Sequence, residues 1–424
     1  MDADSSRNDR VVITGTGLVC SLGATTHEVW NAVIAGRSGV RQIEGFDAQG
    51  FQCSVAAQVQ GLDSESLGFE PRDSRIMDVH SLMLMKSVRD ALSHAALDNA
   101  SVPREKLALF AGMGMVDYRI DDLLPAVVKS GSAGKLFDYR SFYGEGYKEI
   151  HPLWPLSMLN NISFCQVAIA LDIQGENTVF SPDADSGSCA VAEAMWSLQE
   201  GSAVAAVAAG VSETISPFSL ARAQLSGMLP SGAAPGDGNV RPFYNEQNGA
   251  VLGEGCGVLV MELHSAAKKR GVPPLAVLSG CGRSFGKEDG AGAPTVRAIS
   301  AAMEKAISSA EIGPCDIDLI IAHADGMAAG DMNEIKALQQ VFGDCGRDLP
   351  VLCSKAVLGQ TRAAAPVIDL VLAVSMLREG TIPLILRADR SNSGVMDMPV
   401  RRILVNARSC EGQAVSLVLE EAGA

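Results

Sequence analysis

Short runs of β-branched and small apolar residues alternate along this chain with longer amphipathic stretches. RVVITG (residues 10–15) and LALFAGMG (residues 107–114) have the continuous apolar character of buried strands. HEVWNAVIAG (residues 27–36) and CAVAEAMWSLQEG (residues 189–201) have helical spacing and end in glycine, which commonly ends helices. Alternation of this kind predicts an α/β protein with largely buried sheets.

The second half of the chain repeats this alternation. We expect a strand region at residues 249–262, helices at residues 299–311, 332–342 and 367–380, and strands at residues 319–323 and in the closing runs ILVNA and AVSLVLEE. A helix ending LQEG near Gly201 has an echo in a helix ending LREG near Gly380. The echo favours two similar halves that divide near residue 265.

Composition narrows the function classes. The chain has 424 residues, of which 47% are hydrophobic and 20% charged, and a formal net charge of −15. An acidic chain with no basic run repels nucleic acid and anionic membrane, so we expect neither as a partner. The polar N-terminus does not resemble a secretory signal, and no apolar stretch reaches the roughly 18 residues of a membrane helix. We therefore expect a cytoplasmic protein.

The cysteines carry no metal-binding pattern. There are ten, with no CxxC pair, and most lie in apolar or Gly/Ala surroundings, for example Cys165, Cys256 and Cys353. We expect them to be buried, reduced thiols, and we expect no metal site.

One glycine-rich segment invites a nucleotide-binding interpretation. Gly15 and Gly17 follow a predicted strand, but Cys20 occupies the third glycine position of GxGxxG, and no acidic residue ends a second strand at the required distance. We therefore interpret these glycines as a tight turn after the first strand.

Six collinear motifs cover almost the entire chain. They are RVVITGTGLVCSLG at the start, GEN at 175–177, the block at 241–271, IIAH-(x)7-D-x-x-E at 320–334, SKAVLGQTRAAA at 354–365 and VNARSCEGQAVSLVLE at 405–420. Together they resemble the β-ketoacyl-acyl carrier protein synthases. The resemblance implies a thiolase-like, five-layered αβαβα fold. It further implies an N-terminal half at 1–264, with a dimer-interface insertion at about 115–170, and a C-terminal half at 265–424.

The chemistry of that family needs a cysteine at a helix N-terminus, two histidines that donate to a thioester carbonyl, and a nearby lysine. Counting forward from the GEN turn and back from Gly201 gives one position for the nucleophile, and it holds Ala184. The second histidine is replaced by Gln360, whereas the first histidine, His323, and the lysine, Lys355, are retained. The usual HGT after the first histidine reads HAD, with Asp325 placed to satisfy His323 or Lys355.

The closing gating loop, normally GFGG, is also changed. It reads Ser409, Cys410, Glu411 and Gly412. The losses fall together on the chemical positions while the scaffold motifs remain. Cys189 is an alternative nucleophile, but it lies five residues further on, about 140° around the helix, and core packing explains it better. For His323 and Lys355, retained packing is favoured over a live catalytic role.

The resemblance suggests a use for such a chain. Ketosynthases are dimers, and in type II polyketide and aryl-polyene systems a degenerate subunit, the chain-length factor, pairs with an active ketosynthase and helps to shape the acyl tunnel. Aromatic-polyketide chain-length factors commonly carry glutamine at the nucleophile position, so this chain, with alanine there, resembles a relative of that subgroup rather than a member of it. We name Trp154, Met158, Phe164 and Gln166 as tunnel or interface candidates, with ordinary core as an equal alternative.

The expected partners are a catalytic ketosynthase subunit and acyl carrier protein, whose phosphopantetheine carries the substrates. No other cofactor is expected. Two alternatives stay open: a malonyl-carrier protein decarboxylase that primes chain synthesis, and a ketosynthase homologue with altered acyl-transfer chemistry that uses Cys189 or a substrate-borne thiol.

Overall fold

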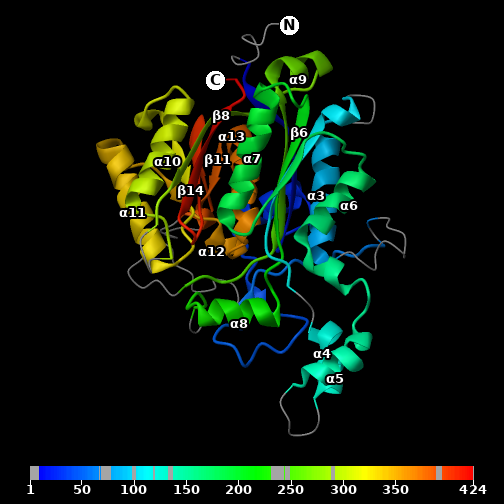
Figure 1. The fold of residues 1–424 in the computed structure, drawn as a ribbon. Helices are drawn as coiled ribbons and strands as arrows, with labels where there is room; N and C mark the ends of the chain where they lie inside the picture. Colours follow the sequence, from blue (N-terminus) through cyan, green and yellow to red (C-terminus); the bar gives the residue numbers. More distant parts are fainter. Residues whose placement is uncertain are drawn as a thin grey trace.

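A computed structural model describes residues 9–65, 67, 78–97, 102–117, 120–131, 137–230, 243, 249–287, 292–387 and 394–423. In the motif block at 241–271, residues 241–248 other than residue 243 therefore lie outside the described residues. Within the described part, the chain has the thiolase-like α/β architecture that the sequence predicts, with a mixed sheet and helices on its faces (Figure 1).

Ten strands form the main sheet, in the order β10-β9-β13-β14-β8-β1-β7-β6-β4-β5. Their bounds are β1 Val11–Cys20, β4 Leu107–Met113, β5 Asn177–Phe180, β6 Ala205–Ser212, β7 Gly255–Leu263, β8 Ala276–Phe285, β9 Leu319–Ile321, β10 Val351–Leu352, β13 Arg402–Arg408 and β14 Gln413–Glu421. The two five-strand halves join where β1 pairs antiparallel with β8. β5 forms the outer edge of the N-terminal half.

Helices make three of the five layers. The middle layer is α7 (Ala184–Gln199) and α13 (Ala365–Glu379), which pack against each other and contact strands of both halves of the sheet. The outer layers are α3 (Val79–His94) with α6 (Asn160–Ala170), and α10 (Val296–Ser309) with α11 (Ala328–Phe342) (Figure 1). The two helices with echoing ends are therefore the central pair, which is what two similar halves require.

The glycines of the first strand do not form a turn, so that expectation is wrong. β1 continues through Gly15 and Gly17, with a register shift against β7 between Ile13 and Gly15, and α3 packs directly on both glycines. A Cβ on Gly15 would lie 2.2 Å from the carbonyl oxygen of Ala91, and one on Gly17 would lie 2.0 Å from that of Ser87. The glycines allow a close helix–strand approach.

Two predicted helices start earlier than their apolar periodicity indicates. α7 begins at Ala184, five residues before Cys189, and α11 begins at Ala328 rather than at Met332. The first turn of each is made of small or polar residues, which hide a helix start from a hydrophobic pattern. The expected strand at 249–262 is confirmed only from Gly255 onward.

A region between β4 and β5 extends away from the sheet (Figure 1). It contains α4 (Ile120–Ser130), α5 (Tyr139–Gly144) and the 3₁₀ turn η3 (Gly146–Glu149). The turn η4 (Trp154–Met158) and α6 follow, and α6 packs back on α3 and β4. This region coincides with the insertion predicted at about 115–170, although its role as a dimer interface stays a prediction.

The remaining elements connect this framework. They are α2 (Thr26–Ile34), α8 (Pro217–Leu225), α9 (His264–Arg270), α12 (Lys355–Leu358), the short pairs β2 (Arg41–Gln42) with β3 (Val55–Ala56) and β11 (Thr381–Pro383) with β12 (Val395–Asp397), and the turns η2 (Arg104–Lys106), η5 (Pro314–Asp316), η6 (Gly343–Gly346), η7 (Arg362–Ala364) and η8 (Leu384–Leu386). Among the described residues, no helix combines the length and apolarity needed to cross a bilayer.

Candidate functional site

A cavity of about 430 Å³ lies where the family motifs meet in space. Its lining combines Asp183 before α7, His323 and Asp325 after β9, Gln360 and Arg362 after α12, and Arg408 at the end of β13. Among the described residues, its lining combines acidic and basic side chains with one histidine, His323, rather than the Cys-His-His set that the resemblance implies.

Ala184 is the first residue of α7 and is fully buried. The count along the sequence therefore identified a helix N-terminus, as a nucleophile position requires, and its methyl group offers no nucleophile. Asp183 precedes it with extended backbone, and Asp185 follows it. Burial, reinforced by the charge of Asp183, raises the pKa of Asp185 to about 6. Two carboxyl groups thus flank the position where a thiolate would need a positive environment.

The loop at 409–412 closes the β13–β14 hairpin over this helix start. The backbone N–H of Cys410 donates to Oδ2 of Asp183 at 3.0 Å, and Arg362 lies 3.6 Å from Oδ1 of the same carboxylate. Ser409 and Gly412 form the tight end of the hairpin, and Glu411 lines the cavity. Partial desolvation of its sulfur, together with the charges of Asp183 and Glu411, raises the pKa of the Cys410 thiol to about 12. The corner around Ala184 therefore opposes a negative sulfur.

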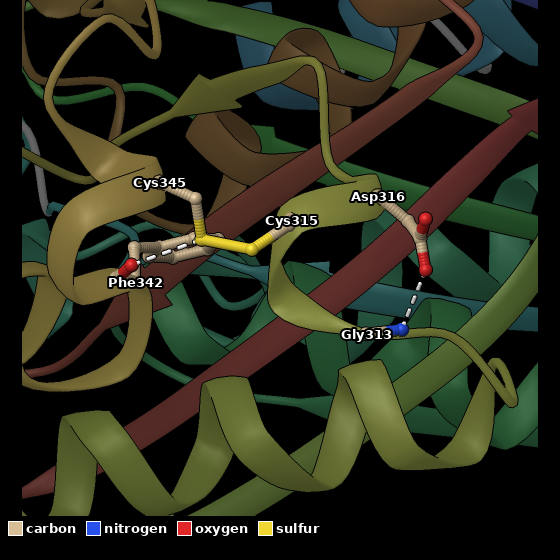
Figure 2. Close-up of a disulfide and its surroundings, with 5 residues drawn as sticks. All are labelled: Gly313, Cys315, Asp316, Phe342 and Cys345. Atoms are coloured by element: carbon tan, nitrogen blue, oxygen red, sulfur yellow. Dashed lines mark hydrogen bonds between the residues drawn. A yellow bond between two sulfur atoms is a disulfide. The ribbon is translucent and has the colours of Figure 1, made fainter.

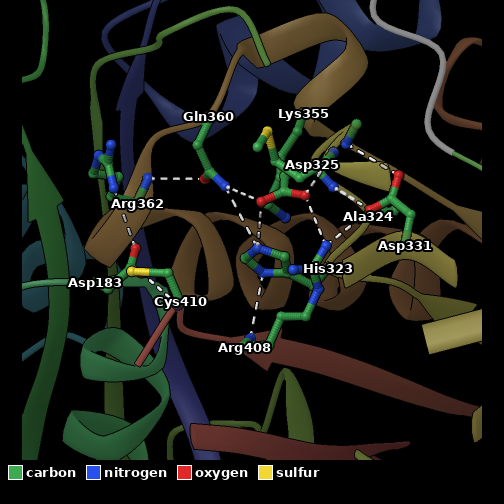
Figure 3. A network of polar contacts seen from close by, with 12 residues as sticks. Asp183, His323, Ala324, Asp325, Asp331, Lys355, Gln360, Arg362, Arg408 and Cys410 are labelled. Carbon is green, nitrogen blue, oxygen red and sulfur yellow. Dashed lines mark hydrogen bonds and ion pairs between the residues drawn. The ribbon is translucent and has the colours of Figure 1, made fainter. Parts of the chain in front are cut away.

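His323 is buried, and both of its ring nitrogens face protein groups (Figure 3). Its Nδ1 accepts from the backbone N–H of Arg408 at 3.4 Å, and its Nε2 lies 3.5 Å from Oδ2 of Asp325. Burial, reinforced by Lys355 and Arg408, lowers the pKa of the ring, so it is neutral. A neutral ring that accepts at Nδ1 carries its proton at Nε2. That proton points to Asp325, the acceptor already present in the site.

Gln360 completes the same contact. Its side-chain N–H group donates to Oδ2 of Asp325 at 3.4 Å, and its Oε1 accepts from the backbone N–H of Arg362 at 3.1 Å. A carboxylate oxygen thus lies between the two groups that stand at the histidine positions. A negative charge there opposes a developing oxyanion rather than stabilising it.

Arg408 holds Asp325 in its charged form. Its Nη2 donates to Asp325 at 2.7 Å and to Asp331 at 2.8 Å, and its Nε lies 3.7 Å from Glu334. Although burial acts in the opposite direction, Arg408 and the donor from His323 hold the pKa of Asp325 well below its usual range. The motifs included Asp331, Glu334 and Arg408 only as pattern positions, and sequence reasoning gave none of them a role in the site.

Helix α11 fixes the loop that carries His323. Glu334 accepts the backbone N–H groups of His323 and Ala324, at 2.8 and 2.9 Å. Asp331 accepts those of Asp325 and the following glycine, each at 3.1 Å. These four bonds hold a short loop in which Ala324 has a positive φ of 32°.

Lys355 is held by a different carboxylate. Its Nζ lies 3.4 Å from Oδ2 of Asp369 on α13, and both side chains are almost completely buried. Although burial acts to lower it, Asp369 raises the pKa of Lys355, so the lysine is charged. Asp325 is therefore the partner of His323 and Arg408 rather than of Lys355.

The other sequence candidates lie outside the cavity. Cys189 is 5% exposed and receives a contact from Gln413 at 3.6 Å, and burial raises the pKa of its thiol. Phe164 belongs to the core beneath α3, and Gln166 on α6 has buried amide atoms with no hydrogen-bond partner among the described residues. Trp154 and Met158 lie in η4, and neither they nor the two α6 residues line the cavity.

The expectation of uniformly buried, reduced cysteines is wrong. Cys315 and Cys345 form a disulfide between the turns η5 and η6 (Figure 2), and Cys165 and Cys410 are exposed. The two bonded cysteines are 30 residues apart, so no local spacing pattern reveals them. Within the described part of the chain, no group of three or more acidic, histidine or cysteine residues is arranged to hold a metal ion.

Comparison with known proteins places this site in its family. The sequence profile described as "Beta-ketoacyl synthase, N-terminal domain" matches residues 8–267, and that described as "Beta-ketoacyl synthase, C-terminal domain" matches residues 275–389. The chain belongs to the β-ketoacyl synthase family. The division into halves at 264/265 remains a proposal, as do the roles of the site residues.

Curated relatives of this β-ketoacyl synthase family member align over nearly its full length. The chain is 26% identical to 3-oxoacyl-[acyl-carrier-protein] synthase 2 of Coxiella burnetii, covering 97% of this chain and 98% of the relative. It is also 26% identical to the protein of that name from Vibrio cholerae, covering 91% and 90%.

Solved structures of similar fold include two that contain ketosynthases. "The ishigamide ketosynthase/chain length factor" superposes with a TM-score of 0.83 at 24% identity, over 97% of this chain and 99% of that one. A type II polyketide ketosynthase in complex with its acyl-carrier protein, "bound to the hexaketide", superposes with a TM-score of 0.80 at 22% identity, over the same shares. At these identities the likeness establishes the fold.

Proposed function

We propose that this chain is a non-condensing subunit of a ketosynthase heterodimer, of the chain-length-factor type, which pairs with an active ketosynthase and helps to shape its acyl tunnel. The observation that carries the proposal is Ala184 at the first position of α7, in a site where the Nε2–H group of His323 faces the charged carboxylate of Asp325. A condensing site cannot form an acyl-enzyme on alanine.

The distribution of exposed apolar side chains supports pairing with a second subunit. Among the described residues, thirteen of the eighteen exposed large apolar side chains fall between Met115 and Ile169. Exposed apolar surface concentrated in one region is typical of an interface. The same region borders β5, the outer edge of the sheet, whose residues are half-buried or exposed. An unpaired edge strand beside an apolar surface suits continuation of the sheet into a second subunit.

The decarboxylase alternative is disfavoured by the charge of the site. Decarboxylation of malonyl-carrier protein forms an enolate, which needs donors that stabilise negative charge. Here the candidate donors, His323 and Gln360, both face the Asp325 carboxylate. The acyl-transfer alternative through Cys189 is disfavoured by its burial, which keeps the thiol protonated.

Co-expression tests the proposal. The chain is produced with a ketosynthase from the same source that has the intact Cys-His-His set, and the complex is isolated through a tag on one subunit. We expect a one-to-one heterodimer in which only the partner becomes acylated by acyl-carrier protein. An active homodimer of this chain, or an acyl group on it, would overturn the proposal.

Two matched variants locate the pairing surface. Ile169 on α6 is 81% exposed, and Leu225 at the end of α8 is 88% exposed. Because only Ile169 lies in the proposed interface, Ile169→Asp should abolish co-purification whereas Leu225→Asp should leave it intact. Equal retention by both variants would place the interface elsewhere.

A further inference from the structure

The disulfide between Cys315 and Cys345 lies on the surface of the protein. Cys315 is in η5 and Cys345 is in η6, and both are exposed. Their Cα atoms are 5.5 Å apart, within the range that a disulfide spans without backbone movement. Small oxidants and reductants can therefore reach the pair without unfolding the chain.

Each of the two turns has a local contact in addition to the cross-link (Figure 2). In η5, a side-chain oxygen of Asp316 accepts the backbone N–H of Gly313 at 2.8 Å. In η6, Sγ of Cys345 lies 3.0 Å from the carbonyl oxygen of Phe342, the last residue of α11, so the reduced thiol has an acceptor there. Both redox states are therefore compatible with the fold.

The loop that the disulfide closes contains much of the buried polar network. Residues 315–345 include β9, the loop with His323 and Asp325, and α11 with Asp331 and Glu334. Asp331 and Glu334 hold that loop through four backbone hydrogen bonds. A cross-link at both ends of this segment lowers the entropy that opening it would gain, so oxidation favours its closed form.

We propose that Cys315 and Cys345 are a reversible redox modification site that controls the local stability of residues 315–345, and through them one wall of the cavity. This proposal is independent of the chain-length-factor assignment. With glutathione disulfide as oxidant, one cysteine thiolate attacks a glutathione sulfur and releases one glutathione thiol. The other thiolate then attacks the mixed disulfide and releases the second glutathione. A dithiol reductant restores the two thiols: one of its thiolates attacks the protein disulfide, and its second thiolate releases the other cysteine as the reductant becomes a disulfide itself.

Alkylation under denaturing, non-reducing conditions tests the chemistry. The chain has ten cysteines, eight of them free and two in the disulfide. After glutathione disulfide treatment the chain should accept eight alkyl groups, and after dithiothreitol ten, with the link mapped by peptide mass spectrometry to this pair. Cys315→Ser cannot close the cross-link, so it should accept nine groups after dithiothreitol and, after glutathione disulfide, either nine or eight with one glutathione on Cys345, whereas the control Cys165→Ser should accept seven and nine. Ten groups in the treated wild type, or a glutathione adduct without the cross-link, would overturn the site.

Hydrogen–deuterium exchange tests the consequence. Reduction of the wild type should speed exchange in peptides from residues 311–346 severalfold, while α3 (Val79–His94) serves as an unchanged internal reference. Cys345→Ser should exchange like the reduced wild type and should not respond to reductant. Equal exchange in the oxidised and reduced wild type would show that the pair does not control this segment.

Discussion

Restoring the missing nucleophile alone should not restore a reactive thiolate. In Ala184→Cys the new thiol would lie between the carboxyl groups of Asp183 and Asp185. A carboxylate about 6 Å away, at an effective dielectric constant of about 40, opposes a thiolate by about 1.4 kcal/mol, which corresponds to about one pKa unit. Two carboxylates raise the thiol pKa from about 8.5 to about 10.5, and the helix N-terminus offsets part of that increase. The native thiol of Cys410, in the same corner, has its pKa raised to about 12.

The assay is the pH dependence of iodoacetamide alkylation, followed by mass spectrometry on the peptide that contains residue 184. The reaction midpoint of Ala184→Cys should lie above about pH 9.5, whereas a free thiol titrates near 8.5. Adding Asp185→Asn should lower the midpoint by about one unit, because one opposing carboxylate is removed. A midpoint below 8.5 in the single variant, or no shift in the double variant, would refute this electrostatic reasoning.

Three further predictions concern the buried charges. Arg408→Met should lower the free energy of unfolding by about 3–5 kcal/mol, because it leaves several buried carboxylates without their cationic partner. In urea denaturation, the double variant with Asp325→Asn should regain part of this free energy, because it removes one of the unpaired charges. Burial, reinforced by neighbouring carboxylates, raises the pKa of Glu213 from 4.5 to about 8, so its contribution to stability falls as pH rises between those values. Glu213→Gln should therefore match the wild type near pH 4.5 and exceed it by at least about 1 kcal/mol at pH 8, and a pH-independent difference would contradict this assignment. The single variant Lys355→Met should be less stable than the double variant Lys355→Met with Asp369→Leu, because only the single variant leaves the Asp369 carboxylate buried and unpaired. A lower denaturation midpoint for the double variant would refute the pairing.

The sequence was sufficient to place the residues whose positions follow from local motifs. Ala184 could be located because motif spacing is fixed on both sides of it, and the structure puts it at the start of α7. Gln360 and His323 could be assigned individually for the same reason, and in the structure Nε2 of Gln360 lies 3.4 Å from Nε2 of His323.

What the sequence did not reveal depends on contacts between distant segments. The sequence pointed to Asp325 as a partner of His323 or Lys355, but its ion pair with Arg408 joins residues 83 positions apart and becomes visible only in the fold. The disulfide and the close approach of α3 to Gly15 also join segments that are distant in sequence. The candidates Trp154 and Met158 depend on a second subunit as well, so a single chain leaves their role as a proposal.

We propose that this chain takes part in condensation without carrying the acyl group. Intact-mass spectrometry of both subunits of the co-purified heterodimer, after incubation with acyl-carrier protein, tests this directly. We expect an acyl adduct on the partner ketosynthase and an unchanged mass for this chain. An acyl adduct on this chain, at Cys189 or at any other residue, would contradict it.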